Sequence, residues 1–445
     1  MYRDLTRGSI LRPLLLFALP MLAGDLLQQL YNIADTLIVS RAIGRGALAA
    51  VGSAYTLMIF LTSILLGLSM GAGALFSICR GRGDESGLRR SVAHAFGFIG
   101  ICALALTAAA YALLPQILRF LQVPDDVAPL MRAYLIAIFA GIPATFLYNF
   151  FACLLRAVGN SSAPLLFSAV SAVLNVGLDL LFVLVFSWGV SGAAWATVIS
   201  QYVAGLGLTL FALRRCPFLL PKKEELRYDG ALLREIISLS SLTCVQQSVM
   251  NFGILMIQGL VNSFGEIVMA AFAAAVKIES FAYMPAQDFG NAFSTFVAQN
   301  YGAAQSERIR KGTRRSFALV FAFCAVISVV VVAAAESLMR LFISAEETEV
   351  IREGVYYLRC VAPFYFGIGF LFLFYALYRA VKKPAMSVVL TVVSLGTRVA
   401  LAYLTAGKLG VTGIWAAIPI GWVLADSIGI AVWLRRREKF LPRTE

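Results

Sequence analysis

Charged side chains are scarce in this chain: Asp, Glu, Lys and Arg together make up 14% of its 445 residues. A soluble globular protein carries roughly a quarter of charged residues, so this chain has too little polar surface to face water on all sides. Hydrophobic residues make up 60% of it. The shortage of charge excludes an ordinary soluble domain and points to the membrane.

Residues suited to catalysis and metal binding are also few. His94 is the only histidine, and the seven cysteines form no CxxC pair. A zinc protease needs HExxH on a helix, and neither this motif nor a Ser/His or paired-aspartate protease pattern is present. The scattered cysteines are expected to be small packing residues. We therefore expect no enzyme activity, no cofactor and no bound metal other than a transported or coupling Na⁺.

Apolar runs of about 20 residues, each long enough to cross a bilayer, recur along the whole chain. Twelve are counted: 13–39, 47–78, 92–118, 130–155, 162–187, 190–213, 232–262, 265–298, 316–343, 355–381, 384–406 and 411–434. The first is long and lacks a small-residue cleavage site, so it is expected to remain as a helix. The pattern predicts an all-α integral membrane protein with twelve transmembrane helices.

The net charge of +13 follows the membrane topology. Most of the 37 Lys and Arg residues fall on loops that share a side with the N-terminus, above all in 214–234, 308–315 and 435–439. Basic loops stay in the cytoplasm, so we expect a multi-pass protein of the inner (plasma) membrane with both termini cytoplasmic. The excess of Lys and Arg then reflects the orientation of the chain in the membrane and attraction to anionic lipid. No nucleic-acid partner is expected.

The chain contains two copies of one unit. Residues 134–158 end in LLRAV and residues 357–381 end in LYRAV, an offset of 223, and GVSGAAWA (189–196) parallels GVTGIWAA (410–417). Each copy holds six spans, which predicts an N-terminal lobe 1–213 and a C-terminal lobe 235–445 joined by a basic cytoplasmic linker 214–234. Repeats of this kind are typical of secondary transporters, with the substrate site near mid-membrane between them.

Polar side chains interrupt two of the apolar runs. Gln28, Tyr31, Asn32 and Asp35 share one face of a helix, and Asn175 and Asp179 lie four residues apart on another. Amides and hydroxyls in such helices commonly form interhelical hydrogen bonds. A carboxylate in hydrocarbon is costly, so Asp35 and Asp179 are functional candidates by default.

Several segments resemble one transporter family. The stretch LPMLAGDLLQQLYNIADTLIVSRAIG (19–44), the NVGLD of 175–179 and the repeated RAVGN and RAVKK loops resemble the multidrug and toxic compound extrusion (MATE) family. Residues 277–303, KIESFAYMPAQDFGNAFSTFVAQNYGA, resemble its DNA-damage-inducible (DinF-like) branch. The resemblance implies two pseudo-symmetric six-helix lobes around a central cavity, and export of organic cations in exchange for H⁺ or Na⁺. It further implies that Asp35, Asn175, Asp179 and Thr197 form the coupling site.

The residues also suggest how coupling works. Two carboxylates in a low-dielectric site can hold a proton or a Na⁺ ion between them. Pro20 removes a backbone hydrogen bond from the first helix and makes bending there easy, so it is the expected hinge. The second repeat has Met256 and Val399 where the first has Asp35 and Asp179. Ion coupling is therefore expected to be confined to the first repeat.

Other polar, aromatic and sulfur side chains are candidates for the substrate cavity. They are Gln28, Tyr31, Asn32, Gln247, Asn251, Met256, Lys277, Tyr283, Met284 and Asp288. Lys277 is expected to be buried, where its ammonium either binds an anionic group of the substrate or belongs to a structural ion network.

The expected partners are small organic substrates and membrane lipids, and the expected state is a monomer. The alternative function is a lipid-linked oligosaccharide flippase, which needs a strongly cationic cavity. An intramembrane enzyme is less well supported. Gly67 and Gly71 form a GxxxG pattern, which predicts close helix packing.

Overall fold

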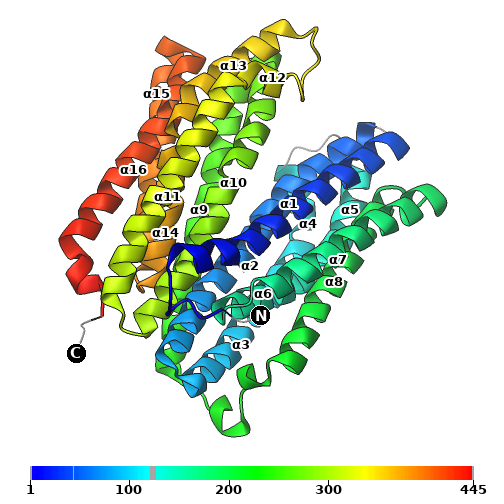
Figure 1. Cartoon of the computed structure of the whole chain (residues 1–445). Coiled ribbons are helices and arrows are strands. Elements are labelled where there is room, and N and C mark those ends of the chain that lie inside the picture. Colours follow the sequence, from blue (N-terminus) through cyan, green and yellow to red (C-terminus); the bar gives the residue numbers. More distant parts are fainter. Residues whose placement is uncertain (1–2, 44, 121–126, 443–445) are drawn as a thin grey trace. The chain divides into compact units, whose positions relative to one another are not determined.

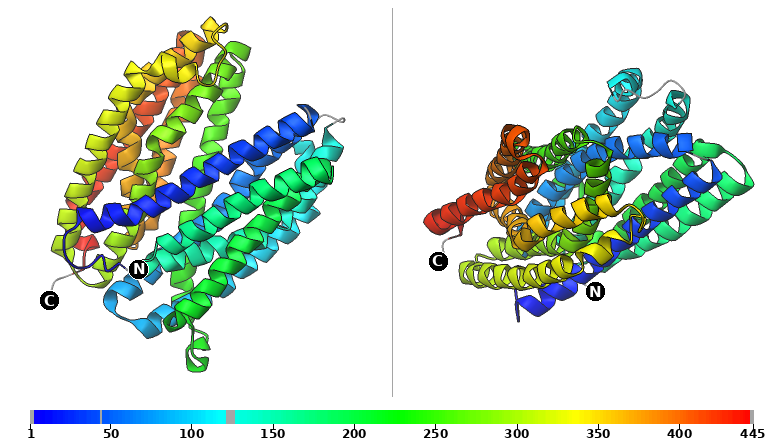
Figure 2. Two further views of the ribbon diagram at one scale, coloured as in Figure 1. Left: turned by 45° about the vertical axis from the view of Figure 1, so that its right-hand side comes forward. Right: turned by 90° about the horizontal axis from the view of Figure 1, so that it is seen from above.

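The computed structural model describes residues 3–43, 45–120 and 127–442, so Gly44 at the end of the 19–44 motif lies outside the described residues. Every regular element in these ranges is a helix (Figure 1, Figure 2). Among them, 11 helices are long and apolar enough to cross a membrane, and a bent pair counted as one span makes 12. The predicted all-α transmembrane fold is confirmed.

The chain forms two compact units. The N-terminal unit comprises Met1–Asp4 and Leu19–Cys244, and the C-terminal unit comprises Leu5–Ala18 and Val245–Glu445. Two helices, α1 (Leu11–Ala42) and α9 (Gly230–Asn262), therefore begin in one unit and continue in the other. The change of unit in α1 falls at Ala18 and Leu19, directly before Pro20. The lobe limits inferred from the repeat, at 213 and 235, stay a prediction.

The helices of the N-terminal unit follow the predicted spans. Besides parts of α1 and α9 they are α2 (Arg45–Arg82), α3 (Glu85–Ala112), α4 (Leu114–Phe120), α5 (Ala128–Phe139), α6 (Ile142–Ala157), α7 (Ser162–Asp179), the π-helix η1 (Leu180–Val185) and α8 (Gly189–Arg215). Figure 1 shows α7 and α8 side by side, and their residues are in extensive contact.

The predicted fourth span, 130–155, is a bent pair. Helices α5 and α6 meet at an angle of 44°. The break lies at Ala140 and Gly141, and Pro143 is the second residue of α6, where a proline cannot extend the preceding hydrogen-bond ladder. The second repeat has a break at the corresponding place, again beside a proline, Pro363.

The C-terminal unit repeats this plan. Its helices, besides parts of α1 and α9, are α10 (Glu266–Gly302), α11 (Ser306–Ala333), α12 (Ala335–Met339), α13 (Thr348–Val361), the 3₁₀ turn η4 (Ala362–Phe364), α14 (Tyr365–Ala380), α15 (Pro384–Leu409) and α16 (Val411–Phe440). Helices α15 and α16 lie side by side over much of their length (Figure 1).

Apolar side chains fill the interior of each unit and also cover the outside. In the N-terminal unit Phe150 is fully buried and packs edge-on against Phe76 and Phe96. Outward-facing residues such as Val173 and Leu404 are more than 70% exposed. An exposed apolar surface of this extent is unfavourable in water and is matched by lipid chains.

The GxxxG pattern of α2 packs against α9 within the N-terminal unit. A Cβ added to Gly67 would lie 2.6 Å from Cα of Cys244, and one added to Gly71 would lie 2.5 Å from Cα of Ser240. Real Cβ atoms do not approach a backbone so closely, so only glycine fits at these two places. The predicted close packing is confirmed.

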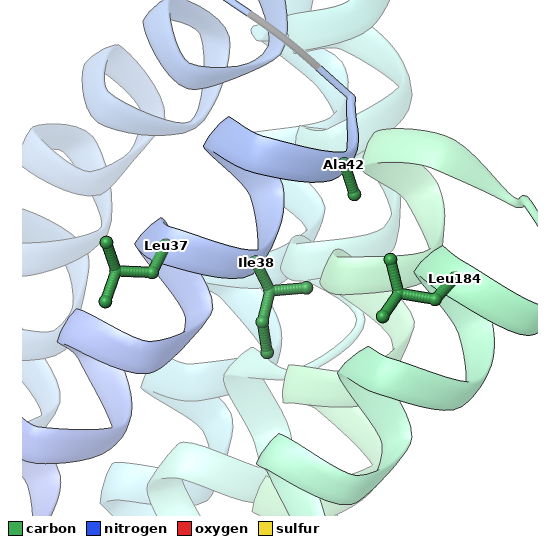
Figure 3. Close-up of a pocket in the computed structure, with 4 residues that line it drawn as sticks. All are labelled: Leu37, Ile38, Ala42 and Leu184. Carbon is green, nitrogen blue, oxygen red and sulfur yellow. The ribbon is translucent and has the colours of Figure 1, made fainter.

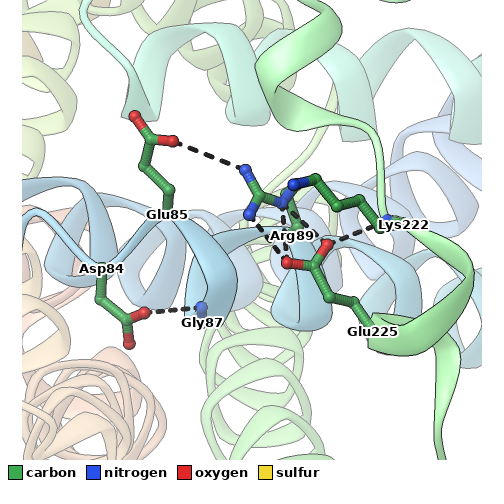
Figure 4. A network of polar contacts seen from close by, with 6 residues as sticks. All are labelled: Asp84, Glu85, Gly87, Arg89, Lys222 and Glu225. Atoms are coloured by element: carbon green, nitrogen blue, oxygen red, sulfur yellow. Dashed lines mark hydrogen bonds and ion pairs between the residues drawn. The ribbon is translucent and has the colours of Figure 1, made fainter.

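The linker after α8 is ordered against the start of α3. It contains the 3₁₀ turns η2 (Pro217–Leu219) and η3 (Lys223–Leu226). Glu225 accepts bonds from Nε of Arg89 at 2.8 Å and from Nη2 at 2.7 Å, and from the backbone N–H of Lys222 at 2.9 Å (Figure 4). The Arg89 guanidinium, helped by the Lys222 N–H, lowers the pKa of Glu225 to about 2.

Candidate functional site

Two carboxyl groups meet inside the N-terminal unit. Asp35 extends from α1, and Asp179 is the last residue of α7. The two side chains lie within hydrogen-bonding reach of each other. Asp179 is fully buried, and the helix continues beyond it as the π-helix η1. π-helical turns inside α-helices are frequent at functional sites.

The pair is short of hydrogen-bond donors. Both oxygens of Asp179 and Oδ1 of Asp35 are buried and receive no hydrogen bond from an N–H or O–H group of the described residues. Two ionised carboxylates at this distance repel each other, and burial makes each charge costly. A proton or a cation between the two groups would remove this repulsion.

Asn175 and Thr197, the other two residues expected at this site, are in contact with each other. The side-chain amide of Asn175 on α7 donates to Oγ1 of Thr197 on α8 at 3.3 Å. Asn175 is buried, and its Oδ1 receives no hydrogen bond from the described residues. The four residues thus supply carboxylate, amide and hydroxyl oxygens in one unit, and carboxylate and carbonyl oxygens suit hard cations such as Na⁺ as well as protons.

Two tyrosines border the pair. Tyr134 on α5 is buried and lies near enough to act electrostatically on Asp35, Asp179 and Tyr31. Tyr31, one turn before Asp35, is hydrogen-bonded to the side chain of Gln28. Tyr134 was not predicted as a site residue, because nothing local in its sequence links it to the first or fifth span. The internal repeat offers a signal that could have found it, since Tyr134 aligns with Tyr357 at the offset of 223.

A small, open apolar pocket lies between α1 and η1. Its volume is about 260 Å³, and it is lined by Leu37, Ile38 and Ala42 from α1 and by Leu184 from η1 (Figure 3). Leu37 and Ile38 follow Asp35 within one turn, and Leu184 follows Asp179 by five residues. None of the four residues that line the pocket has an ionisable side chain. Any binding of a proton or a cation in this region therefore depends on Asp35 and Asp179.

The predicted substrate residues are divided between the two units. Gln28, Tyr31 and Asn32 lie on α1 in the N-terminal unit. The remaining seven lie in the C-terminal unit: Gln247, Asn251 and Met256 on α9, and Lys277, Tyr283, Met284 and Asp288 on α10. Gln247, Met284 and Asp288 are buried there, whereas Met256 is exposed.

The prediction that Lys277 is buried is wrong. Its side chain is exposed, while Glu279, two residues later on α10, points into the C-terminal unit and is 6% exposed. Residues two apart project about 200° from each other around a helix, so burying Glu279 turns Lys277 outward. The long aliphatic stem of a lysine lets its ammonium reach polar surroundings from such a position.

Among the described residues, the C-terminal unit buries three carboxyl groups. They belong to Glu279 and Asp288 on α10 and to Asp426 on α16. Asp426 was not predicted, although it interrupts the apolar run 411–434 and the rule that selected Asp35 applies to it equally. The positions matching Asp35 and Asp179 are indeed apolar in this repeat, but its interior is not free of ionisable groups.

Comparisons with known proteins agree with the internal repeat and with the fold. The MatE family profile matches residues 20–181 and again residues 243–404, with the same offset of 223 between the two starts. The Bacillus subtilis protein named "Probable multidrug resistance protein YpnP" is 30% identical over 426 residues, which are 95% of this chain and 94% of that protein.

Two solved structures share the fold. One is a MOP superfamily transporter from Pyrococcus furiosus, with a TM-score of 0.92, 22% identity and coverage of 99% of this chain and 98% of that one. The other is an outward-facing multidrug resistance MATE family transporter, with a TM-score of 0.90, 23% identity and coverage of 99% and 98%. The two profile matches and the relative along nearly the full length leave one assignment: the chain belongs to the MatE (MATE) family of membrane transporters.

Proposed function

We propose that this transporter exports organic, mostly cationic drugs or toxic metabolites from the cell in exchange for H⁺ or Na⁺. The proposal is supported by family membership and by the names of the relatives, among them "Multidrug export protein MepA" of Staphylococcus saprophyticus, 21% identical over 447 residues. In such an exchanger the two repeats open a substrate site alternately to the two sides of the membrane.

The coupling site is formed by Asp35, Asn175, Asp179 and Thr197. The observation that carries this assignment is the carboxyl pair, three of whose oxygens are buried and receive no hydrogen bond from the described residues. Loading one proton or one Na⁺ changes the charge of the pair by one and supplies the missing contact. The membrane potential contributes about 2.3 kcal/mol per charge per 100 mV to such a step.

Pro20 acts as the hinge that transmits ion loading to the substrate site. The helix hydrogen bond that its missing N–H would make to Leu16 is absent, and α1 changes from one compact unit to the other directly before it. Ion binding at Asp35, about four turns further along α1, bends this helix and weakens the drug site. The substrate residues of α1, Gln28, Tyr31 and Asn32, lie between the hinge and Asp35.

The protein resides in the plasma membrane with both termini in the cytoplasm, as its basic loops indicate. It works as a monomer in contact with membrane lipids, and its 277–303 segment assigns it to the DinF-like branch. These assignments rest on the sequence pattern, and labelling of single cysteines introduced near either terminus, from one side of the membrane at a time, tests the orientation.

The function is tested by efflux of a cationic fluorescent drug from proteoliposomes under separately imposed H⁺ and Na⁺ gradients. We expect one of the gradients to drive efflux by the wild-type protein and neither to drive it in Asp179→Asn, because the amide takes up no proton and leaves Asp35 without the second carboxylate of the pair. An Asp179→Asn protein that still responds to the gradient would refute the coupling site. Drug flux that follows neither gradient, together with movement of lipid-linked sugars, would favour a flippase.

A further inference from the structure

A second polar cluster lies inside the C-terminal unit and contains none of the residues assigned to coupling. Its centre is Glu279 on α10, which accepts a hydrogen bond of 2.6 Å from the hydroxyl of Tyr357 on α13. Both residues are buried, Tyr357 almost completely. A carboxyl group held so deep in a membrane helix is retained for a partner or a function.

The tyrosine is held rigidly in place. The Tyr357 ring packs edge-on against Trp415, with 4.8 Å between ring centroids, and edge-on against Phe272, with 5.4 Å between ring centroids. The rings of Trp415 and Phe272 stack on each other. The indole N–H of Trp415 donates to Glu353 at 3.2 Å. Three helices, α10, α13 and α16, therefore fix the direction in which the Tyr357 hydroxyl points, and that direction is the Glu279 carboxyl.

A cation, Arg398 on α15, lies in the neighbourhood of Glu279. Its guanidinium is near enough to act electrostatically on Glu279, Tyr283 and Tyr357. Nε of Arg398 is buried and donates to no acceptor among the described residues, while the residue as a whole is partly exposed. The guanidinium thus has a buried donor that no acceptor among the described residues fills. Its planar fork matches a carboxylate, which accepts two parallel hydrogen bonds.

The internal repeat relates this cluster to the carboxyl pair of the N-terminal unit. Tyr357 is the counterpart of Tyr134, which borders Asp35 and Asp179. Arg398 directly precedes Val399, the counterpart of Asp179. The same region of the repeat therefore carries two acidic groups in one unit and an acidic group with a basic group in the other.

We propose that Glu279, Tyr357 and Arg398 form a second ligand site, which binds an organic carboxylate together with a proton. In the empty site ionised Glu279 neutralises Arg398. An arriving carboxylate takes over Arg398 through its two oxygens, and Glu279 then takes one proton from solution. Release of the carboxylate returns that proton. The net charge of the site is the same in both states, so no isolated charge is left in the membrane interior.

Four groups from the surrounding helices act on Glu279. They are Tyr357 on α13, Tyr365 on α14, Tyr283 on α10 itself and Arg398 on α15. Three are tyrosines, which stay neutral at physiological pH, so Arg398 is the one cation among them. Occupation of Arg398 by a ligand is therefore the event that changes the charge balance at Glu279.

The test uses benzoate as the probe and titration calorimetry on the purified full-length protein in detergent. Repeating the titration in buffers of different ionisation enthalpy measures the protons taken up per benzoate bound. We expect about one proton per benzoate in the wild type, and affinity that falls as the pH rises. Arg398→Gln should weaken binding about 10- to 100-fold, because two charge-assisted hydrogen bonds are lost.

Glu279→Gln separates the roles of the two side chains. This variant keeps Arg398 free of a competing carboxylate, so it should bind benzoate at least as tightly, without proton uptake and without pH dependence. It also shows that loss of binding in Arg398→Gln is not a folding defect, once both variants elute as the wild type does in size exclusion. Unchanged binding in Arg398→Gln, or proton uptake that persists in Glu279→Gln, would overturn the proposal.

Two further variants exclude other sources of the signal. Loss of benzoate binding in Lys277→Gln with retention in Arg398→Gln would assign the anion to the exposed lysine and refute the site. Asp179→Asn should bind benzoate with its proton as the wild type does. The Asp179→Asn measurement makes the test of the carboxylate site independent of the proposed coupling site, because each of the two proposals can fail without the other.

Discussion

Tyr134 and Tyr357 occupy equivalent positions in the two repeats, and each lies beside a buried carboxyl group in its own unit. In the N-terminal unit the neighbours are Asp35 and Asp179, and in the C-terminal unit the neighbour is Glu279. Both repeats therefore have a tyrosine beside an acidic side chain, but the acidic residues lie at positions that do not correspond in the two repeats.

Tyr134→Phe is predicted to weaken ion coupling without unfolding the protein. The ring that packs inside the unit is kept, and only a hydroxyl dipole beside the carboxyl pair is lost. This electrostatic contact is weaker than a hydrogen bond to a charged group, which is worth about 1.5–3 kcal/mol, so the ion concentration for half-maximal efflux should rise by less than about tenfold in proteoliposomes. Tyr202→Phe is the control, because its hydroxyl donates to the backbone carbonyl of Ala140 instead. Equal behaviour of the two variants would contradict a role for Tyr134.

Gly67→Ala and Gly71→Ala are each predicted to destabilise the N-terminal unit. The added methyl would overlap the backbone of α9 at Cys244 or Ser240, and such overpacking costs about 1–3 kcal/mol. Thermal unfolding in detergent, followed by circular dichroism, should show a lower midpoint. Gly97→Ala on α3 is the matched control, since its Cβ would meet no atom within 4 Å, and it should unfold as the wild type does or slightly later. A normal midpoint for both α2 variants would show that the two helices can move apart freely.

The contact between the linker and α3 is predicted to weaken at acidic pH, because Glu225 becomes protonated there. Because the Arg89 contact and the Lys222 N–H lower the pKa of this carboxyl from 4.5 to about 2, the stabilisation is complete above about pH 4.5. It is lost as the pH falls toward 2, where the folded carboxyl takes up its proton. Pepsin, which is active in this range, should cut residues 217–229 increasingly as the pH falls.

The matched variants isolate the ion pair. Arg89→Gln should be cut in the linker already at the upper end of the pepsin range, whereas Glu224→Gln, at the exposed neighbouring residue, should follow the wild type. Identical cleavage profiles for Arg89→Gln and the wild type would rule out the pair as the anchor.

Arg308→Gln is predicted to free the segment before α1. The Arg308 guanidinium donates to the carbonyls of Leu5, Arg7 and Gly8 at 3.2, 2.9 and 2.7 Å, and these bonds hold the start of the chain within the C-terminal unit. Their loss should speed amide hydrogen exchange in residues 5–12 about tenfold or more. Arg310→Gln on the same helix is the control, because Arg310 pairs with exposed Glu307 and Glu438, and such surface pairs contribute little. Similar exchange in both variants would contradict the assigned role of Arg308.

The sequence alone was sufficient for the membrane fold, the number of spans and the repeat. Each transmembrane helix needs an apolar run long enough to cross the bilayer, and this requirement is the same whatever its neighbouring helices are. The runs can therefore be recognised one by one in the sequence. The helical spacing of Asn175 and Asp179 and the isolation of Asp35 among apolar residues likewise indicate the carboxyl pair, since both features can be read from the order of the residues.

Only the tertiary structure decided which side chains face one another. It added Tyr134 to the pair, placed Asp179 at the change from α- to π-helix, turned Lys277 outward and gathered Glu279, Tyr357 and Arg398 from three helices. A helix in lipid is apolar on nearly all sides, so its periodicity does not mark the face that packs inward. That face is chosen by contacts between helices distant in the chain, and those contacts are set when the helices pack together.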